Sequence, residues 1–172
     1  TVSGNLPNAT TTNAHTFSLS APGRFVFDSL NNSETTWSLL HPSATLVNNR
    51  SFALSDSADA NPVLDLPAGS FQLTVRGVAG PYSFRLLPAT SATAFVPGQV
   101  VTNSISPARA TALWTFPAQA GQRFYFDGLP RSGFSTEAYA RILPPGGAPL
   151  GPAFGISADI DTFMAPVSGD YL

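Results

Sequence analysis

Hydrophobic and polar residues alternate in short runs along the chain, and glycine- or proline-containing turns separate the runs. The clearest run extends from Phe71 to Val75, and Tyr82 to Leu86 follows it after a turn at Gly80-Pro81. A period of two places alternate side chains on the same face of a β-strand. About seven such runs at regular spacing predict an antiparallel β-sandwich in the first half of the chain.

Alternate apolar positions of these runs are expected to form the core of that sandwich. The first strand is expected at Val2 to Leu6, and a polar segment extends from Asn48 to Asn61. A chain with 16 Pro and 14 Gly does not favour long helices. The residues predicted to be buried are Phe17, Phe25, Phe27, Leu39, Phe71, Leu73, Tyr82 and Phe84.

A glycine turn, an aromatic strand and an aspartate occur twice in this order. The stretch Pro22 to Leu30 has a second copy in which Asp127 takes the place of Asp28, at an offset of 99 residues. Upstream of it, Phe17 aligns with Trp114 at an offset of 97. A period of about a hundred residues is the size of one small domain, so the repeated module is the unit of the fold.

The repeat divides the chain into two modules. Residues 1–87 form the first, residues 88–98 form a linker rich in Ala, Thr, Ser and Pro, and residues 99–172 form the second. Within the second module, Val101 to Ile105 corresponds to the first strand of the first module. The predicted fold class is therefore all-β, with two tandem antiparallel β-sandwich modules of jelly-roll-like type.

The second module is expected to be incomplete at its C-terminal side. Leu172 corresponds to Gln72, so the second copy has no counterpart of Leu73 to Leu86. A sandwich without these residues exposes an unpaired edge, which is a template for another strand. Either the sequence is a fragment of a longer repeat protein, or a neighbouring molecule donates a strand, with Val2 to Leu6 or Thr93 to Val96 as the donor.

Composition and charge limit the classes of partner and site that the protein is expected to have. Charged residues make up 10% of the chain, the eight basic residues are all arginine, and the net charge is −2. Nucleic-acid binding requires a positive surface, so we expect no nucleic-acid partner. Cysteine is absent, which excludes disulfides and thiolate metal sites. The apolar runs are too short for a transmembrane helix.

No stretch of the sequence has the pattern of an active site. The two histidines, His15 and His41, have no counterpart in the second module, and neither G-x-S-x-G nor H-E-x-x-H occurs. Glu34 and Glu137 occupy comparable places in different modules, so we expect them a domain apart. Glycoside hydrolysis requires two carboxylates within about 10 Å. We therefore expect that the protein is not an enzyme.

Two aspartate- and asparagine-containing segments are the candidate metal sites. Asp59 with Asn61 in the first module, and Asp159 with Asp161 in the second, offer the hard oxygen ligands that calcium binds. The alternative is that these side chains form Asx turns where strands begin. Calcium is the only cofactor that the sequence suggests.

The aromatic residues also have two interpretations. Six of them are either core residues, which their period of two favours, or a platform on which sugars stack: Trp37, Trp114, Phe25, Phe27, Phe124 and Phe126. Tyr125 lies on the opposite face from Phe124 and Phe126, so it is expected to be an exposed contact or part of a second face.

The sequence resembles the bacterial pre-peptidase C-terminal domain. The resemblance lies in Phe25-Val26-Phe27-Asp28, in Asp59-Ala60-Asn61-Pro62, and in Ala68 to Val75 followed by Tyr82-Ser83-Phe84. It covers the first module fully and the second up to Leu172. The resemblance implies a non-catalytic, jelly-roll-like β-sandwich that accompanies secreted proteases and large surface proteins. Relatives include collagen-binding modules with calcium sites.

Two functions therefore remain in competition. The first is a non-catalytic structural or adhesive repeat module of an exported bacterial protein, extracellular or at the cell surface, assembling by strand complementation. Its partners are other copies of itself or neighbouring domains of a larger chain. The second is a ligand-binding accessory module of a secreted hydrolase, which binds an extracellular polymer such as collagen, carbohydrate or cell wall.

Overall fold

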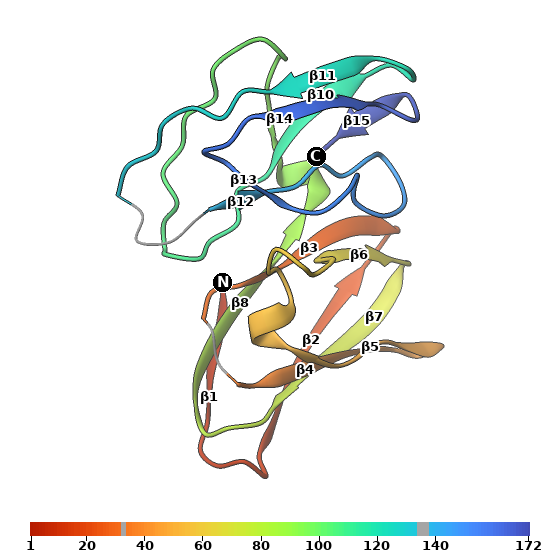
Figure 1. Cartoon of the computed structure of the whole chain (residues 1–172). Helices are drawn as coiled ribbons and strands as arrows, with labels where there is room; N and C mark the ends of the chain where they lie inside the picture. The colour runs from red at the N-terminus through yellow and green to blue at the C-terminus, as the bar shows by residue number, and fades with distance from the viewer. Residues whose placement is uncertain (32–33, 134–137) are drawn as a thin grey trace. The chain divides into compact units, whose positions relative to one another are not determined.

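The computed structural model describes residues 1–31, 34–133 and 138–172. These residues form β-strands and two single 3-10 turns, which confirms the all-β prediction (Figure 1). The chain divides into two compact units. The first contains Thr1–Ser91 and Ser104–Ala112, and the second contains Ala92–Asn103 and Leu113–Leu172.

The first unit is a sandwich of two four-stranded antiparallel sheets, with eight strands in chain order. One sheet has the order β1-β8-β3-β6 and the other the order β2-β7-β4-β5. The first sheet contains β1 (Val2–Leu6), β8 (Gly80–Pro88), β3 (Gly23–Ser29) and β6 (Val63–Leu66). The second contains β2 (Thr12–Leu19), β7 (Gly69–Arg76), β4 (Thr36–His41) and β5 (Ala44–Ser51).

Alternate residues of both sheets meet in one apolar core, as the period of two predicts. Among the residues predicted to be buried, Phe17 and Phe25 pack against this core but remain half-buried. The others are buried: Phe27, Leu39, Phe71, Leu73, Tyr82 and Phe84.

An aromatic stack links the two sheets at the centre of this core. Phe27 of β3 stacks on Trp37 of β4 with 4.0 Å between ring centroids, and on Phe84 of β8 with 5.3 Å. The Trp37 indole N–H donates to Ser55 Oγ at 2.7 Å. Phe52, which lies in the segment predicted to be polar, joins the core because the 3-10 turn η1 (Phe52–Leu54) directs it inward.

The second unit consists of three smaller sheets. Its apolar core is smaller, with Phe116, Ala118, Ala165 and Tyr171 buried. The sheet β15-β10-β9 contains β15 (Gly169–Tyr171), β10 (Trp114–Ala118) and β9 (Thr93–Ala94), which runs parallel to β10. The other two are β11 (Arg123–Phe126) with β14 (Ile160–Met164), and β12 (Tyr139–Ala140) with β13 (Phe154–Gly155).

Strand register corrects the alignment of the two copies. Phe17 lies opposite Phe71 in the first unit, and Phe116 lies opposite Tyr171 in the second. Phe17 therefore corresponds to Phe116, an offset of 99 residues, and the predicted match to Trp114 is wrong by two positions. A shift of two residues keeps the same side chains on the same face, so the sequence pattern alone does not reveal it.

Val101 to Ile105 forms no strand, although the repeat predicted one. In the first unit, the corresponding strand β1 pairs only with β8. Among the described residues of the second unit, no strand matches β8, so this segment has no such partner there. Val101 is accordingly 41% exposed.

The segment predicted as a linker contains ordered elements. Within residues 88–98 lie the last residue of β8, the 3-10 turn η2 (Ala89–Ser91) and β9. The two predicted donor strands are already paired inside the chain: Val2–Leu6 forms β1 beside β8, and Thr93–Ala94 forms β9 beside β10.

The central stack generates a stability prediction. Phe27→Ala should lower the free energy of unfolding of the first unit by about 3–5 kcal/mol, because it leaves a cavity between Trp37 and Phe84. Urea denaturation followed by Trp37 fluorescence in a Trp114→Phe background measures the change. Phe25→Ala, in the same strand but half-buried, is the matched control and should cost less. Equal losses would contradict the central role of the stack.

Candidate functional site

His15 serves the packing of the first unit. Its Nε2 atom lies 2.8 Å from the Tyr82 hydroxyl, which also accepts a hydrogen bond from Asn13 Nδ2 at 3.0 Å. The imidazole meets the rings of Tyr82 and Phe84 edge to face. His15 lies within β2, and its imidazole forms a hydrogen-bonded pair with the ring of Tyr82 at the margin of the core.

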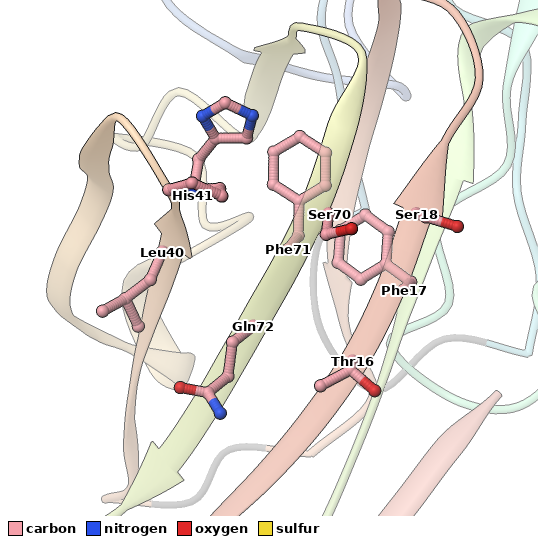
Figure 2. A pocket seen from close by; sticks show the side chains of 9 residues that line it. Thr16, Phe17, Ser18, Leu40, His41, Ser70, Phe71 and Gln72 are labelled. Atoms are coloured by element: carbon pink, nitrogen blue, oxygen red, sulfur yellow. The ribbon is translucent and has the colours of Figure 1, made fainter.

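His41 lies at the end of β4, beside a shallow hollow on the second sheet (Figure 2). Its Nδ1 atom is 2.7 Å from Ser43 Oγ, and its ring centroid is 5.1 Å from that of Phe71. Glycine is favoured at position 69, because its φ is +138° and a Cβ atom there would come within 2.4 Å of His41 Nε2. Ser43 and His41 are two residues apart and together form the turn between β4 and β5.

The hollow measures about 690 Å³ and opens on the outer face of the sheet. Hydroxyl and amide groups line it together with Leu40 and His41. Phe17 and Phe71 also line it, and their rings stack with 4.9 Å between centroids. Its polar lining residues are Thr16, Ser18, Ser70 and Gln72. No charged residue of the described chain lines the hollow, so the arrangement suits weak polar contacts with an extended ligand.

Three of the four candidate calcium ligands accept hydrogen bonds from backbone N–H groups. Asn61 Oδ1 accepts a hydrogen bond from Val63 N at 3.1 Å, an Asx turn at the start of β6, while Asp59 is exposed. Asp159 Oδ1 accepts from Gly128 N at 2.9 Å, and Asp161 Oδ1 accepts from Thr162 N at 2.6 Å. Within the described ranges, no three acidic or histidine side chains gather as metal ligands. Calcium binding at either pair stays a prediction.

Asp159 also interacts with the exposed ring of Tyr125. The Tyr125 hydroxyl donates to the Asp159 carboxylate, which lowers the pKa of Asp159 and raises the pKa of Tyr125. Tyr125 is 55% exposed, in agreement with its predicted place on the opposite face from Phe124 and Phe126. Of the two glutamates, Glu34 is exposed and Glu137 lies outside the described residues.

Sequence reasoning missed a buried polar cluster around Asp28. Asp28 lies inside β3 and is fully buried. Its carboxylate pairs with the Arg85 guanidinium on β8 and accepts from Thr111 N at 2.8 Å. Arg85 also donates to Thr111 O at 3.0 Å. The sequence signal for this position is that the aspartate recurs in the second copy, as Asp127.

Asp56 lies next to this cluster and has a perturbed pKa. Its Oδ2 atom accepts a hydrogen bond from Ser29 N at 2.6 Å. Burial raises the pKa of Asp56 to about 6, and the nearby charge of Asp28 raises it further, against the lowering effect of the Ser29 hydrogen bond. Protonation of Asp56 is therefore easier in the folded state than in the unfolded chain.

This shift predicts a pH-dependent stability. Because the folded pKa lies above the unfolded one, the contribution of Asp56 is fully present below about pH 4 and is lost as the pH rises through about 6. Urea denaturation of the wild type should therefore show a decline over this range that Asp56→Asn reduces, since the amide oxygen still accepts from Ser29 N. The exposed Asp59→Asn is the control. An unchanged decline in Asp56→Asn would contradict the assignment.

One edge of β11 has no strand partner among the described residues. On its other edge β11 pairs with β14, with Arg123 opposite Met164 and Phe124 opposite Phe163. The matching strand of the first unit, β3, pairs with β6 on one edge and with β8 on the other. The register of β11 with β14 repeats that of β3 with β6, so the unpaired edge is the one that β8 covers in the first unit.

This difference changes the environment of two equivalent phenylalanines. Phe27 is fully buried beneath Phe84 of β8, whereas Phe126 remains half-exposed beside Phe154 at 4.8 Å. The equivalent pair Val26 and Tyr125 differs more, because Val26 is 2% exposed and Tyr125 is 55% exposed. Two similar sequences are thus buried to different extents, and of β3 and β11 only β3 has strands on both edges in the described part of the chain.

These features give three candidates for function: the shallow hollow, the buried aspartates and the unpaired edge of β11. The part of the chain that the structure describes holds no helix with the length and hydropathy needed to cross a lipid bilayer. No protein-family model matches the chain, and a search of curated proteins finds none that is significantly similar to it.

Proposed function

We propose that the protein is a non-catalytic structural or adhesive repeat module of an exported bacterial protein, and that it assembles by strand complementation. The resemblance to the pre-peptidase C-terminal domain supports this proposal, as does the use of both histidines in packing and turn contacts. The proposed location is extracellular or the cell surface. The proposed partners are other copies of the module or neighbouring domains of a larger chain.

The second unit is proposed to be an incomplete copy of the first sandwich. Its strands β10, β11, β14 and β15 match β2, β3, β6 and β7 in sequence order and in antiparallel register. Leu172 exchanges two backbone hydrogen bonds with Leu143, at 2.7 and 2.9 Å, as Gln72 pairs with Leu40. The jelly-roll-like description of both units belongs to this proposal.

The unpaired edge of β11 is the observation that carries the proposal. An exposed edge presents free N–H and C=O groups in a row, and proteins usually protect such an edge with charge, proline, a bulge or a covering segment. The aromatic sequence Phe124-Tyr125-Phe126 favours strand pairing, and both phenylalanines are only half-buried. A strand added here would bury these rings and satisfy the backbone groups.

Self-association should therefore depend on β11. Sedimentation of the chain over a range of concentrations is expected to show assembly, and Tyr125→Lys is expected to weaken it at least about tenfold, because a lysine protects an edge from pairing. Val167→Lys is the matched control in the same unit, since Val167 is 46% exposed and lies outside any strand.

The sedimentation result decides the proposal. Assembly that is reduced by Tyr125→Lys and unaffected by Val167→Lys supports complementation at this edge. A chain that stays monomeric at every concentration, or an assembly that both variants leave intact, overturns it.

The hollow on the second sheet supports a second candidate, a ligand-binding accessory module. Its hydroxyl and amide lining offers hydrogen-bonding groups to an extended polymer such as carbohydrate or collagen. In this case the ligand would lie across β2, β7 and β4, over Thr16, Gln72 and Leu40 (Figure 2).

This candidate predicts specific chemical shift changes. Titration of the labelled chain with soluble oligosaccharides and with triple-helical peptides should perturb the amide of Gln72, and Gln72→Ala should weaken binding several-fold through the loss of one hydrogen-bonding group. Gln122→Ala, exposed in the second unit, should have no effect. Absence of any perturbation at Gln72 would remove the second candidate.

A further inference from the structure

Asp28 is fully buried although its side chain points away from the apolar core. It follows Phe27, which belongs to that core, and successive side chains of a strand point to opposite faces of the sheet. The burial of Asp28 therefore requires a cover on the outer face of β3. Residues 104–112 contribute to this cover, because Asp28 Oδ1 accepts a hydrogen bond from Thr111 N at 2.8 Å. The equivalent Asp127 of the second copy is exposed.

Residues 104–112 form a strap on the first unit. The strap belongs to that unit, whereas the residues on both sides of it, Ala92–Asn103 and Leu113–Leu172, belong to the second unit. None of residues 104–112 is buried. A hydrogen bond from Ala110 N to Pro107 O, at 3.0 Å, forms a turn inside the strap. Because so little of the strap is removed from water, its polar contacts with the sandwich matter most for its attachment.

The ion pair between Asp28 and Arg85 binds both backbone groups of Thr111. The Asp28 carboxylate accepts from Thr111 N, and Arg85 Nη2 donates to Thr111 O at 3.0 Å. The same guanidinium donates through Nε to Asp28 Oδ2. Each of these hydrogen bonds involves a charged group, which makes it stronger than a bond between neutral groups. One residue of the strap is thus held by two strands of the sandwich, β3 and β8.

A second charged interaction involves Arg109 of the strap. Burial is the main cause of the raised pKa of Asp56, and the positive charge of Arg109 opposes this shift, so the two side chains attract each other. The charge of Asp28 also acts on Asp56. Two aspartates of the sandwich and two arginines, one of them on the strap, therefore interact at this place.

We propose that the strap opens and closes separately from the sandwich, and that the ion pair of Asp28 and Arg85 is the contact that keeps it closed. In the closed state the strap covers the Asp28 carboxylate. In the open state Asp28 and Arg85 reach solvent, and the peptide bond after Arg109 becomes accessible to a protease. The two sheets remain paired in both states, because their strands bond to each other. This inference is independent of self-association and adds a conformational change to the proposed function.

Hydrogen exchange of single amides in the full chain tests the inference. The amides of Phe27 and Leu30, which bond to Pro62 O and Ser83 O, report the opening of the sandwich, and the amide of Thr111 reports the strap. In the wild type, Thr111 should be protected, but less than Phe27 and Leu30. Arg85→Lys should raise exchange at Thr111 about tenfold, because a lysine keeps the charge but loses the planar fork that bonds to two groups. Exchange at Phe27 and Leu30 should not change.

The matched control is Arg24→Lys. Arg24 also lies on the sheet that contains β3 and β8, and its guanidinium pairs with Asp65 through Nε and Nη2. This substitution makes the same chemical change at an ion pair that does not touch the strap. Exchange at Thr111 should therefore remain at the wild-type rate in this variant.

A second variant leaves the ion pair intact. Thr111→Pro removes the N–H group that Asp28 accepts, and it should raise the rate of trypsin cleavage after Arg109 several-fold, since cleavage requires local opening. Val100→Pro is the control, because Val100 is 70% exposed and lies outside the strap. Mass spectrometry of the fragments identifies the cleaved bond.

The results decide between a separate strap and a fixed part of the sandwich. Faster exchange at Thr111 alone in Arg85→Lys, together with faster cleavage after Arg109 in Thr111→Pro, supports the inference. Thr111 exchanging at the same rate as Phe27 and Leu30 in the wild type, or a joint rise of all three in Arg85→Lys, shows that the strap opens only when the sandwich unfolds and overturns it. Equal exchange at Thr111 in Arg85→Lys and in the wild type overturns the role of the ion pair.

Discussion

The stack of Phe27 between Trp37 and Phe84 holds the first unit together, because it joins three strands from both sheets. The three rings are nearly parallel, with interplanar angles of 5° and 11°. Phe27 reaches this position only because β3 has a neighbour on each edge, β6 and β8. Burial of a ring of this size contributes several kcal/mol, so the pairing of β3 on both edges and the packing of the core depend on each other.

The repeat places an equivalent phenylalanine, Phe126, in a strand with a different set of neighbours. Phe126 has the sequence context of Phe27, with aromatic and arginine neighbours that match, yet it packs against Phe154 and stays half-exposed. Intrinsic β-propensity cannot explain this difference, since the two stretches are nearly identical. The burial of the two phenylalanines differs together with the strands that pair beside them. β-Propensity likewise measures how well a side chain fits a half-buried sheet surface, so it depends on those neighbours.

Much of the fold follows from the sequence, and the failures have physical causes. Period-two alternation located β7, β8 and the core phenylalanines, because it reports directly which face is buried. It did not locate Phe52, which reaches the core from a 3-10 turn, or β9, whose two residues acquire a strand conformation only from β10. It also misplaced the match of Phe17 by two residues, since a shift of two leaves the buried face unchanged.

The sites were harder to predict than the fold, and the aspartates show why. The oxygen ligands of Asp59 and Asn61 predicted a calcium site. In the structure, Asn61 Oδ1 accepts a backbone hydrogen bond at the start of β6. The sequence around Asp28 does not predict a site, because nothing local indicates that Arg85, 57 positions away, will pair with it. A buried carboxylate is costly without such a partner. The same residue of the repeat is fully buried beside Arg85 at Asp28 and exposed at Asp127, so the local sequence alone does not determine whether this position holds a buried ion pair.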